Sequence, residues 1–385
     1  MFTRRAGAWI LAATALLTAL AGRARAHVRY VTEGSGDPVD AVRFVIDVLS
    51  DPLNAALFAG GGLLVAAAAA GYLYFRPAAY DLAVLRTTLH EYVDLVPWML
   101  RLSVGLPLVG AGFAGYFFSP AVPAVTRLFQ VAVGFFLLFG FATRFVAAVA
   151  LLAYFVRLPF EPQLLLASEY VGALFGIVLV GSGRPSADQM FKEVADDDRT
   201  LYSSVDPVRS VSRRFDAVVS PYEDHAATGV RVALGVNFVY LGFAEKLLNP
   251  GRALQVVEKY DLTAVVPIEP GMWVVGAGLT EMALGTALVL GVFTRANCAV
   301  AFVLFTTTLF GLPDDPVIAH ISLFGLASML FITGSGPLAL DNLVHGRTAS
   351  VDTSTTGTEE SEVTEDDRRG RAESRVARSD ARFGP

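Results

Sequence analysis

The stretch from Arg101 to Pro120 reads RLSVGLPLVGAGFAGYFFSP, and the stretch from Arg231 to Pro250 reads RVALGVNFVYLGFAEKLLNP. The two stretches align without a gap. Seven of the twenty positions are identical, including both ends and a shared Gly-Phe-Ala core. Such a match between distant segments indicates an internal repeat, and a repeat constrains the fold more strongly than any single predicted element.

Two further blocks follow in the same order in each copy. Residues 128–144 align with residues 279–295, and the two blocks share two glycines and a closing Thr-Arg dipeptide. A Gly-Ser-Gly triplet is then followed, at the same spacing, by an aspartate, which is Asp188 in the first copy and Asp341 in the second. Three matching blocks in one order are difficult to explain by shared hydrophobicity alone, so we expect two copies of one unit.

The composition predicts that both copies lie in a membrane. Hydrophobic residues make up 54% of the 385-residue chain and charged residues only 17%, which is unusually apolar for a soluble protein. We therefore expect an all-α fold, a polytopic transmembrane helix bundle with about nine spans of the length that crosses a bilayer. Residues 54–75 form the first expected span, followed by 98–119, 124–142, 145–158 and 164–181 in the first copy and 230–248, 272–292, 296–312 and 317–333 in the second.

The expected orientation follows from the span count and from the N-terminus. Four crossings return the chain to its starting side, so the two copies should be parallel repeats with the same orientation. Residues 1–26 have the layout of a secretory signal peptide, with a twin-arginine signal as the alternative. We expect a multi-pass protein of the cell (plasma) membrane, with the mature N-terminus outside and the C-terminus in the cytoplasm, and the positions of the arginines agree.

The segments outside the spans complete the expected domain organisation. The loop 251–270 is about twenty residues longer than its counterpart in the first copy, and is either a lid over a lipid-side cavity next to Glu281 or a connector lying on the membrane interface. The tail is too polar to build a core. The predicted parts are a signal peptide at 1–26; an external segment, one transmembrane helix and an interfacial helix at 27–96; repeat 1 at 97–190; a cytoplasmic linker at 191–228; repeat 2 at 229–342; and a disordered cytoplasmic tail at 343–385.

The second copy carries a recognisable pattern. It comprises residues 231–242, the pair Glu245-Lys246, then Glu281, the glycines and Thr-Arg of residues 285–295, and the closing Gly-Ser-Gly with Asp341. This pattern resembles the DoxX family of small four-helix membrane proteins, well over 230–342 and more weakly over 98–190. The chain is similar to double-length DoxX/DoxD proteins with two tandem DoxX-like units. The resemblance implies a membrane subunit of a quinone-linked, thiosulfate:quinone-type oxidoreductase that needs a redox partner subunit.

Ionisable groups inside the spans are the candidates for chemistry, because each costs about 2.5–3.5 kcal/mol on insertion scales. Glu281, near the middle of its predicted helix, is the expected catalytic residue, as a proton relay or a hydrogen-bond donor to a quinone carbonyl; the alternative is a carboxyl that bonds neighbouring helices. The aligned first-copy residue is Gln130, so charge is expected only in the second copy. The expected substrate- or quinone-binding residues are Asn237, Glu245, Lys246 and His320, opposite Pro107, Gly115, Tyr116 and Ala167.

Four arginines recur at equivalent positions of the two copies and are expected to be structural. Arg101 and Arg231 begin the copies, and Arg144 and Arg295 follow the second span of each. Such residues anchor a helix end to lipid phosphates or cap its carbonyl groups.

The sequence argues against several other classes of site. The single cysteine, Cys298, excludes disulfide frameworks and cysteine-ligated metal clusters, and no metal site is expected. Of the five histidines only His320 lies clearly inside a span, which disfavours a haem with two histidine ligands. Copper at an N-terminal His27 would lack a second external histidine. A net charge of −6 with few lysines offers no surface for nucleic acid.

Two functions from different classes remain open. In the first, the second copy shapes a quinone or small-substrate cavity around Glu281, no cofactor is bound covalently, and a partner supplies the electrons. In the second, the chain is a non-enzymatic membrane scaffold or small-solute transporter. Membrane lipids are expected partners in both, and the sequence leaves the oligomeric state open.

Overall fold

The computed structural model describes residues 40–124, 127–197, 199–200, 209–314 and 317–342. The predicted signal peptide at 1–26, His27 and the predicted disordered tail at 343–385 lie outside the described residues. The chain is helical almost throughout this range, as expected for a helical membrane protein. Before the first copy it forms α2 (Ala41–Ser50), α3 (Pro52–Phe75), α4 (Ala79–His90) and the short η2 (Val93–Leu95).

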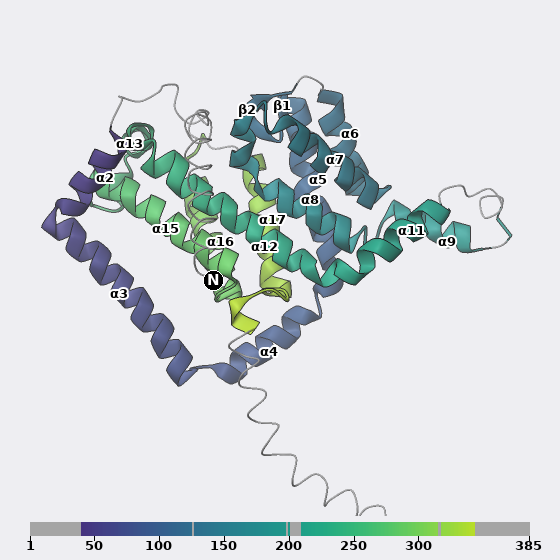
Figure 1. The fold of residues 1–385 in the computed structure, drawn as a ribbon, viewed down its shortest axis with the longest axis horizontal. Coiled ribbons are helices and arrows are strands. Elements are labelled where there is room, and N and C mark those ends of the chain that lie inside the picture. Colours follow the sequence, from purple (N-terminus) through teal and green to yellow (C-terminus); the bar gives the residue numbers. More distant parts are fainter. Residues whose placement is uncertain (1–39, 125–126, 198, 201–208, 315–316, 343–385) are drawn as a thin grey trace, which may run out of the picture. The chain divides into compact units, whose positions relative to one another are not determined.

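The two copies contain the same order of four main helices (Figure 1). Each of the nine predicted spans coincides with one of these helices or with α3. The first copy has α5 (Val96–Ala114), β1 (Tyr116–Phe117), β2 (Ser119–Pro123), α6 (Arg127–Phe139), α7 (Thr143–Arg157), η3 (Pro162–Ala167) and α8 (Glu169–Val180). The second has α12 (Ala226–Tyr240), which continues as the π-helical turn η5 (Leu241–Leu247), then α13 (Pro250–Lys259), α14 (Leu262–Val265), α15 (Pro270–Leu290), α16 (Thr294–Gly311) and α17 (Val317–Thr333).

One predicted span extends beyond the C-terminal end of its helix. The helix expected over 98–119 stops at Ala114, and β1 and β2 follow it as an antiparallel hairpin, the one strand pair in the described ranges. Gly115 ends the helix with a φ of 88°, a conformation that glycine adopts readily. Proline at 120 and 123 cannot donate a backbone hydrogen bond and so cannot continue a helix. The second copy has Glu245 in place of Gly115, and there the helix continues as η5.

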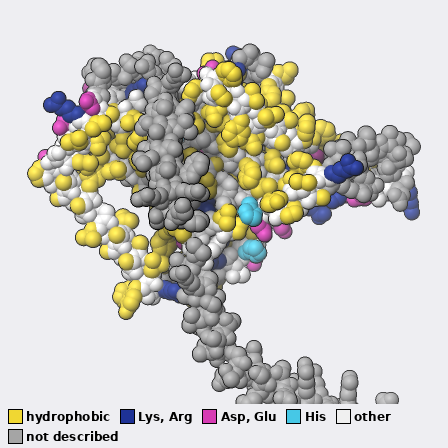
Figure 2. Space-filling model, in the orientation of Figure 1, with side chains coloured by type: hydrophobic (Ala, Val, Ile, Leu, Met, Phe, Trp, Pro, Cys, Tyr) yellow, Lys and Arg dark blue, Asp and Glu magenta, His cyan; other side chains and the backbone are white. Residues whose placement is uncertain are grey.

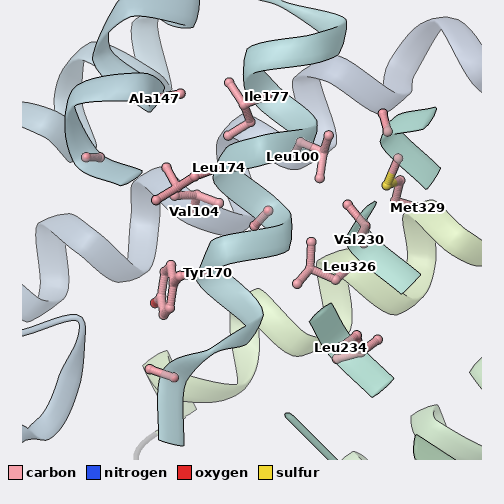
Figure 3. Close-up of a cluster of buried hydrophobic side chains, with 14 of the residues drawn as sticks. Leu100, Val104, Ala147, Tyr170, Leu174, Ile177, Val230, Leu234, Leu326 and Met329 are labelled. Atoms are coloured by element: carbon pink, nitrogen blue, oxygen red, sulfur yellow. The ribbon is translucent and has the colours of Figure 1, made fainter. Parts of the chain in front are cut away.

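The two copies pack against each other by exchanging equivalent contacts. The last main helix of the first copy, α8, lies against the first of the second, α12, and likewise α17 lies against α5. This exchange is what an approximate two-fold axis between the copies produces. Figure 3 shows the shared core, in which buried side chains of α5, α8, α12 and α17 lie on both sides of α8.

Small residues allow these helices to approach closely. A Cβ added at Gly172 of α8 would overlap that of Ala233 and stand 3.0 Å from the carbonyl oxygen of Gly229. Gly325 of α17, at the equivalent place, lies against Ser103 of α5 in the same way. Gly172 and Gly325 therefore make equivalent close contacts between the copies on the two sides of the axis.

We expect Gly172→Val to separate α8 from α12 and to lower stability by about 1–3 kcal/mol, as overpacking does in close-packed interiors. The measurement is the apparent unfolding temperature in mild detergent. The matched control is Gly61→Val in α3, where an added Cβ meets nothing within 4 Å. Equal unfolding temperatures for the two variants would show that the contact at Gly172 does not hold the copies together.

The described residues contain four helices long and apolar enough to cross a membrane: Pro52–Phe75, Val93–Ala114, Arg214–Leu247 and Pro270–Leu290. Other predicted spans are shorter apolar helices, such as Glu169–Val180 and Val317–Thr333. Large apolar side chains are exposed along these helices, for example Leu64, Phe113, Phe145 and Val303. The face seen in Figure 2 is correspondingly rich in hydrophobic side chains and has few charged ones. Such a surface fits contact with lipid.

The linker and the insertion in the second copy are both helical. Between the copies the chain forms α9 (Ala187–Asp196), α11 (Arg209–Val219) and η4 (Ser220–His225). The expected loop 251–270 contains α13 and α14, and α13 buries Ala253 and Val257 against Val274 of α15. Lys259 and Tyr260 both donate hydrogen bonds to Asp314, at 2.7 and 2.9 Å, and tie the insertion to the turn after α16. The first half of the segment is therefore packed against α15 and the turn after α16.

Candidate functional site

A small cavity with a few polar groups in its wall lies where the two copies meet, near the hairpin and η3. Its volume is about 40 Å³, and at roughly 10–15 Å³ per water it has room for two or three water molecules. A benzene-sized ring needs a cavity of about 150 Å³. The cavity therefore admits water and protons but not a quinone ring. It is lined by Tyr116, Phe118, Ser119, Pro120, Leu166, Ala167, Glu169, Tyr170, Asn237, Leu241, Ala319, His320 and Leu323.

Glu169, the first residue of α8, is the ionisable centre of this cavity. Its side chain is 5% exposed. The side-chain amide of Asn237 in α12 donates to a Glu169 carboxylate oxygen at 3.2 Å, and also lies 3.1 Å from both the Ser168 hydroxyl oxygen and the Leu166 carbonyl oxygen. The Ser322 hydroxyl of α17 donates to the other carboxylate oxygen at 3.4 Å. Neutral donors from two helices, α12 and α17, thus hold one buried carboxyl of a third, α8.

Glu169 and Ser322 occupy equivalent places in the two copies. They are 153 residues apart, and the equivalent glycines Gly181 and Gly334 are separated by the same number. Their contact therefore places the carboxyl close to the axis between the copies. The other polar residues break this symmetry, because Asn237 and His320 align with Pro107 and Ala167.

The hydroxyls of Tyr116 and Tyr170 and the imidazole of His320 also line the cavity. Outside the lining, the Tyr154 hydroxyl donates to the carbonyl oxygen of Leu164 at 2.6 Å and fixes η3. Burial raises the pKa of Tyr116, which follows α5 in the hairpin, so this hydroxyl stays protonated and can donate. His320 is buried with its ring edge toward Phe305, at 6.4 Å between ring centroids. The cavity thus combines a carboxyl, an imidazole and hydroxyls, the groups that exchange protons in enzymes.

The sequence interpretation missed Glu169. It held that charge is present in the second copy and not in the first, and this was wrong, because Glu169 lies inside the predicted span 164–181. The signal was available, since an ionisable residue within a predicted span is a functional candidate by itself. The comparison started from the ionisable and polar residues chosen in the second copy. It did not reveal Glu169, because the residue aligned with Glu169 is the uncharged Ser322.

Glu281, the predicted proton relay, lies outside the cavity lining and is paired with Lys246. The Lys246 ammonium donates to both carboxylate oxygens at 2.7 Å. The lysine and glutamate side chains are 27% and 13% exposed, so the pair is partly accessible. The first-copy counterpart of Glu281, Gln130, is fully buried. The structure thus separates the predicted residues, with Asn237 and His320 in the cavity and Lys246 with Glu281 outside it.

We expect the Lys246–Glu281 pair to couple energetically. Lys246→Met and Glu281→Gln should each lower the apparent unfolding temperature, because each leaves one charge without its partner. The double variant should be more stable than the two single losses predict, with a coupling of about 1–3 kcal/mol. A four-protein cycle in one detergent measures this. Additive losses would mean that the two side chains do not interact.

Glu245, the remaining predicted residue, lies in η5 and faces Arg252 of α13. The two side chains are 2% and 5% exposed, and the Arg252 Nη1 atom is 3.9 Å from a Glu245 carboxylate oxygen. The π-helical turn that carries Glu245 is uncommon and often marks functional sites.

The four recurring arginines bind backbone carbonyl groups at one end of the bundle. Arg144 donates to the Leu179 carbonyl oxygen at 2.9 Å, and Arg295 to those of Phe331 and Ile332 at 2.9 and 3.0 Å. Arg101 donates to the Pro185 carbonyl oxygen at 2.6 Å. These contacts have the geometry of the predicted capping role. Arg231 makes the largest set, to the carbonyl oxygens of Leu288, Val289, Ser335 and Leu338.

In the described ranges no three His, Cys, Asp or Glu side chains gather at metal-binding distance. Cys298 is buried in the core of the second copy.

The comparisons with known proteins concern the second copy. Residues 226–313, from α12 to the turn after α16, match the family model described as DoxX. The first copy lies outside the matched range. No curated protein and no solved structure matches the chain.

Proposed function

Because the chain carries a DoxX-family region at residues 226–313, we propose that it is the membrane subunit of a quinone-linked oxidoreductase of the thiosulfate:quinone type. The observation that carries the proposal is the buried Glu169 carboxyl in a water-sized cavity between the copies. Reduction of a quinone to a quinol consumes two electrons and two protons. A membrane subunit with a buried proton-exchanging site meets the second requirement.

The size of the cavity indicates that the quinone head group and the exchangeable proton are held at two different places. Two or three waters fit beside Glu169 but a ring does not, so the quinone head group has to bind elsewhere. The partly exposed Lys246–Glu281 pair offers a donor and a carboxyl to quinone carbonyl oxygens from the lipid side. Glu169 then acts as the proton reservoir, and Asn237 and Ser322 hold its carboxyl in place.

The electrons come from a partner subunit in this proposal. One cysteine and five histidines in the whole chain give it few ligands for a redox metal of its own. The hairpin and η3, at the end of the bundle predicted to face the exterior, form the surface nearest to the cavity. We therefore place the partner on the outer side of a cell membrane, with the C-terminus in the cytoplasm.

Purification of the full-length chain from its native membranes in mild detergent tests this function. Solvent extraction should yield about one quinone per chain, and a redox-active subunit should copurify. A preparation that contains neither, although the chain is intact, would overturn the proposal.

The position of the cavity also favours a second candidate, a transporter of a water-sized solute. Binding sites of transporters built from repeats lie at the interface between the repeats, as this cavity does. The two functions differ in one measurement. Proteoliposomes containing the purified chain alone should show solute-driven swelling or proton flux for a transporter, and none for a subunit that needs a redox partner.

A further inference from the structure

We propose that a buried polar track carries protons from Glu169 to Glu245, through the water-sized cavity and Tyr240, and ends beside the Lys246–Glu281 pair. The inference rests on the proposed function, because it connects the proton reservoir with the place where the quinone head group is proposed to bind. Tyr240, Glu245 and Arg252 are buried polar groups that the cavity alone does not explain.

The π-helical turn aligns the second half of this track. In an α-helix, residues three or four apart share a face, so residues 240 and 245 would point in different directions. In η5 the bonding shifts to residues five apart, and the Leu248 backbone N–H donates to the Phe243 carbonyl oxygen at 2.9 Å. This shift brings Glu245 toward the face of Tyr240. The Asn249 side chain donates to the Ala244 carbonyl oxygen at 2.6 Å and supports the turn.

Tyr240 stands between the cavity and Glu245. It packs in one buried cluster with Leu166, and Leu241 lies against the same cluster. Both leucines also line the cavity, so Tyr240 is directly behind its wall. Its buried hydroxyl has no hydrogen-bond partner among the described residues. A buried hydroxyl in that state calls for water, which is also what a proton-carrying connection requires.

Tyr240 is near both ends of the track. Its side chain packs against the cavity wall, and Glu245 is close enough to act electrostatically on its hydroxyl. The chemistry conserves atoms at each step. A proton leaves the Glu169 carboxyl for water in the cavity, the Tyr240 hydroxyl accepts one proton from water and releases its own, and the Glu245 carboxylate receives the last.

Arg252 lies beside Glu245, the residue at the end of the proposed proton track. Burying an ion pair with its charged atoms 3.9 Å apart is a poor way to stabilise a fold, because the attraction does not repay the loss of hydration. The same arrangement places a positive charge beside the carboxyl at the end of the track. Lys246, the next residue, carries the partly exposed pair with Glu281.

Infrared spectroscopy of the purified, quinone-free chain tests the track. The carbonyl stretching band of the protonated Glu169 carboxyl is identified by its loss in Glu169→Gln. Its shift after transfer to D₂O gives the rate at which that carboxyl exchanges its proton. We expect Tyr240→Phe and Glu245→Gln to slow this exchange about 100-fold, the lower end of what a positioned proton-transfer group contributes. Tyr240→Phe removes only a hydroxyl, and unchanged helical circular dichroism shows that the fold is intact.

The control is Tyr260→Phe, since the Tyr260 hydroxyl bonds Asp314 away from the cavity. Exchange as fast in Tyr240→Phe as in Tyr260→Phe would overturn the track, and so would the absence of any band that Glu169→Gln removes. Slowed exchange in a chain that yields no quinone and no redox partner would support the track and reject the quinone-linked function. The experiments can therefore reject the proton track without rejecting the quinone-linked function, and the reverse.

Discussion

Glu169→Gln is expected to lower thiosulfate-dependent reduction of decylubiquinone in native membranes by about 10²–10⁴-fold, the range that a positioned proton-transfer group contributes. The amide has nearly the same shape and can still bond Asn237 and Ser322, so the protein should accumulate and remain folded. Only the exchangeable carboxyl proton is lost. The measurement compares the rate per chain with that of the wild type.

Glu161→Gln is the matched control for this variant. Glu161 precedes η3 and lies near Arg157 at its surface, at 3.7 Å, so loss of its charge should leave the rate unchanged. If Glu169→Gln reduced quinone as fast as Glu161→Gln, the carboxyl would be a packing group and the reservoir would have to be sought elsewhere. Failure of Glu169→Gln to accumulate would show instead that the carboxyl itself is needed for folding.

Arg231→Met is expected to have the largest effect on stability, a loss of about 3 kcal/mol or more, because carbonyl groups of two helix ends lose a charged donor. The guanidinium is almost completely buried and donates to four carbonyl oxygens, among them those of Val289 and Ser335. Arg231→Lys should restore little of the lost stability, because one ammonium group cannot reproduce the planar set of guanidinium donors. Apparent unfolding temperature and yield of monodisperse protein in detergent report the loss.

Arg101→Met provides the comparison, because Arg101 occupies the equivalent position and donates to one described carbonyl, that of Pro185. The loss of stability in Arg101→Met should be clearly smaller than that in Arg231→Met. Equal losses at the two arginines would mean that the number of carbonyl contacts does not set their contribution. The outcome therefore tests whether the second copy is the more tightly capped of the two.

The repeat pattern was sufficient to predict the helix order, since apolar segments of suitable length and repeated glycines are local properties of the chain. The end of α5 was predicted wrongly although Gly115, Pro120 and Pro123 were visible, because hydrophobicity continues through the hairpin. The helices within 251–270 were also missed. Their burial depends on α2 and α15, which the sequence does not place beside them.

The candidate site was only partly predictable for a related reason. Asn237 and His320 were expected to bind substrate, and they do line the cavity, but around Glu169 and not around Glu281. Which carboxyl is enclosed depends on how α8 packs against α12 and α17, a contact between copies. An internal alignment compares residues that are equivalent, whereas the cavity is built from residues that are not.

The contact between Glu169 and Ser322 has a consequence for how such a site can arise. In an assembly of two identical chains, a residue beside the symmetry axis faces its own image, so a glutamate there would oppose a second glutamate. Two carboxyls at that distance could not both ionise and would share a proton, which fixes their chemistry as a pair. A single chain that contains both halves is free of this restriction. It can oppose the acid with a hydroxyl, and one carboxyl then titrates alone in an environment that each half tunes independently.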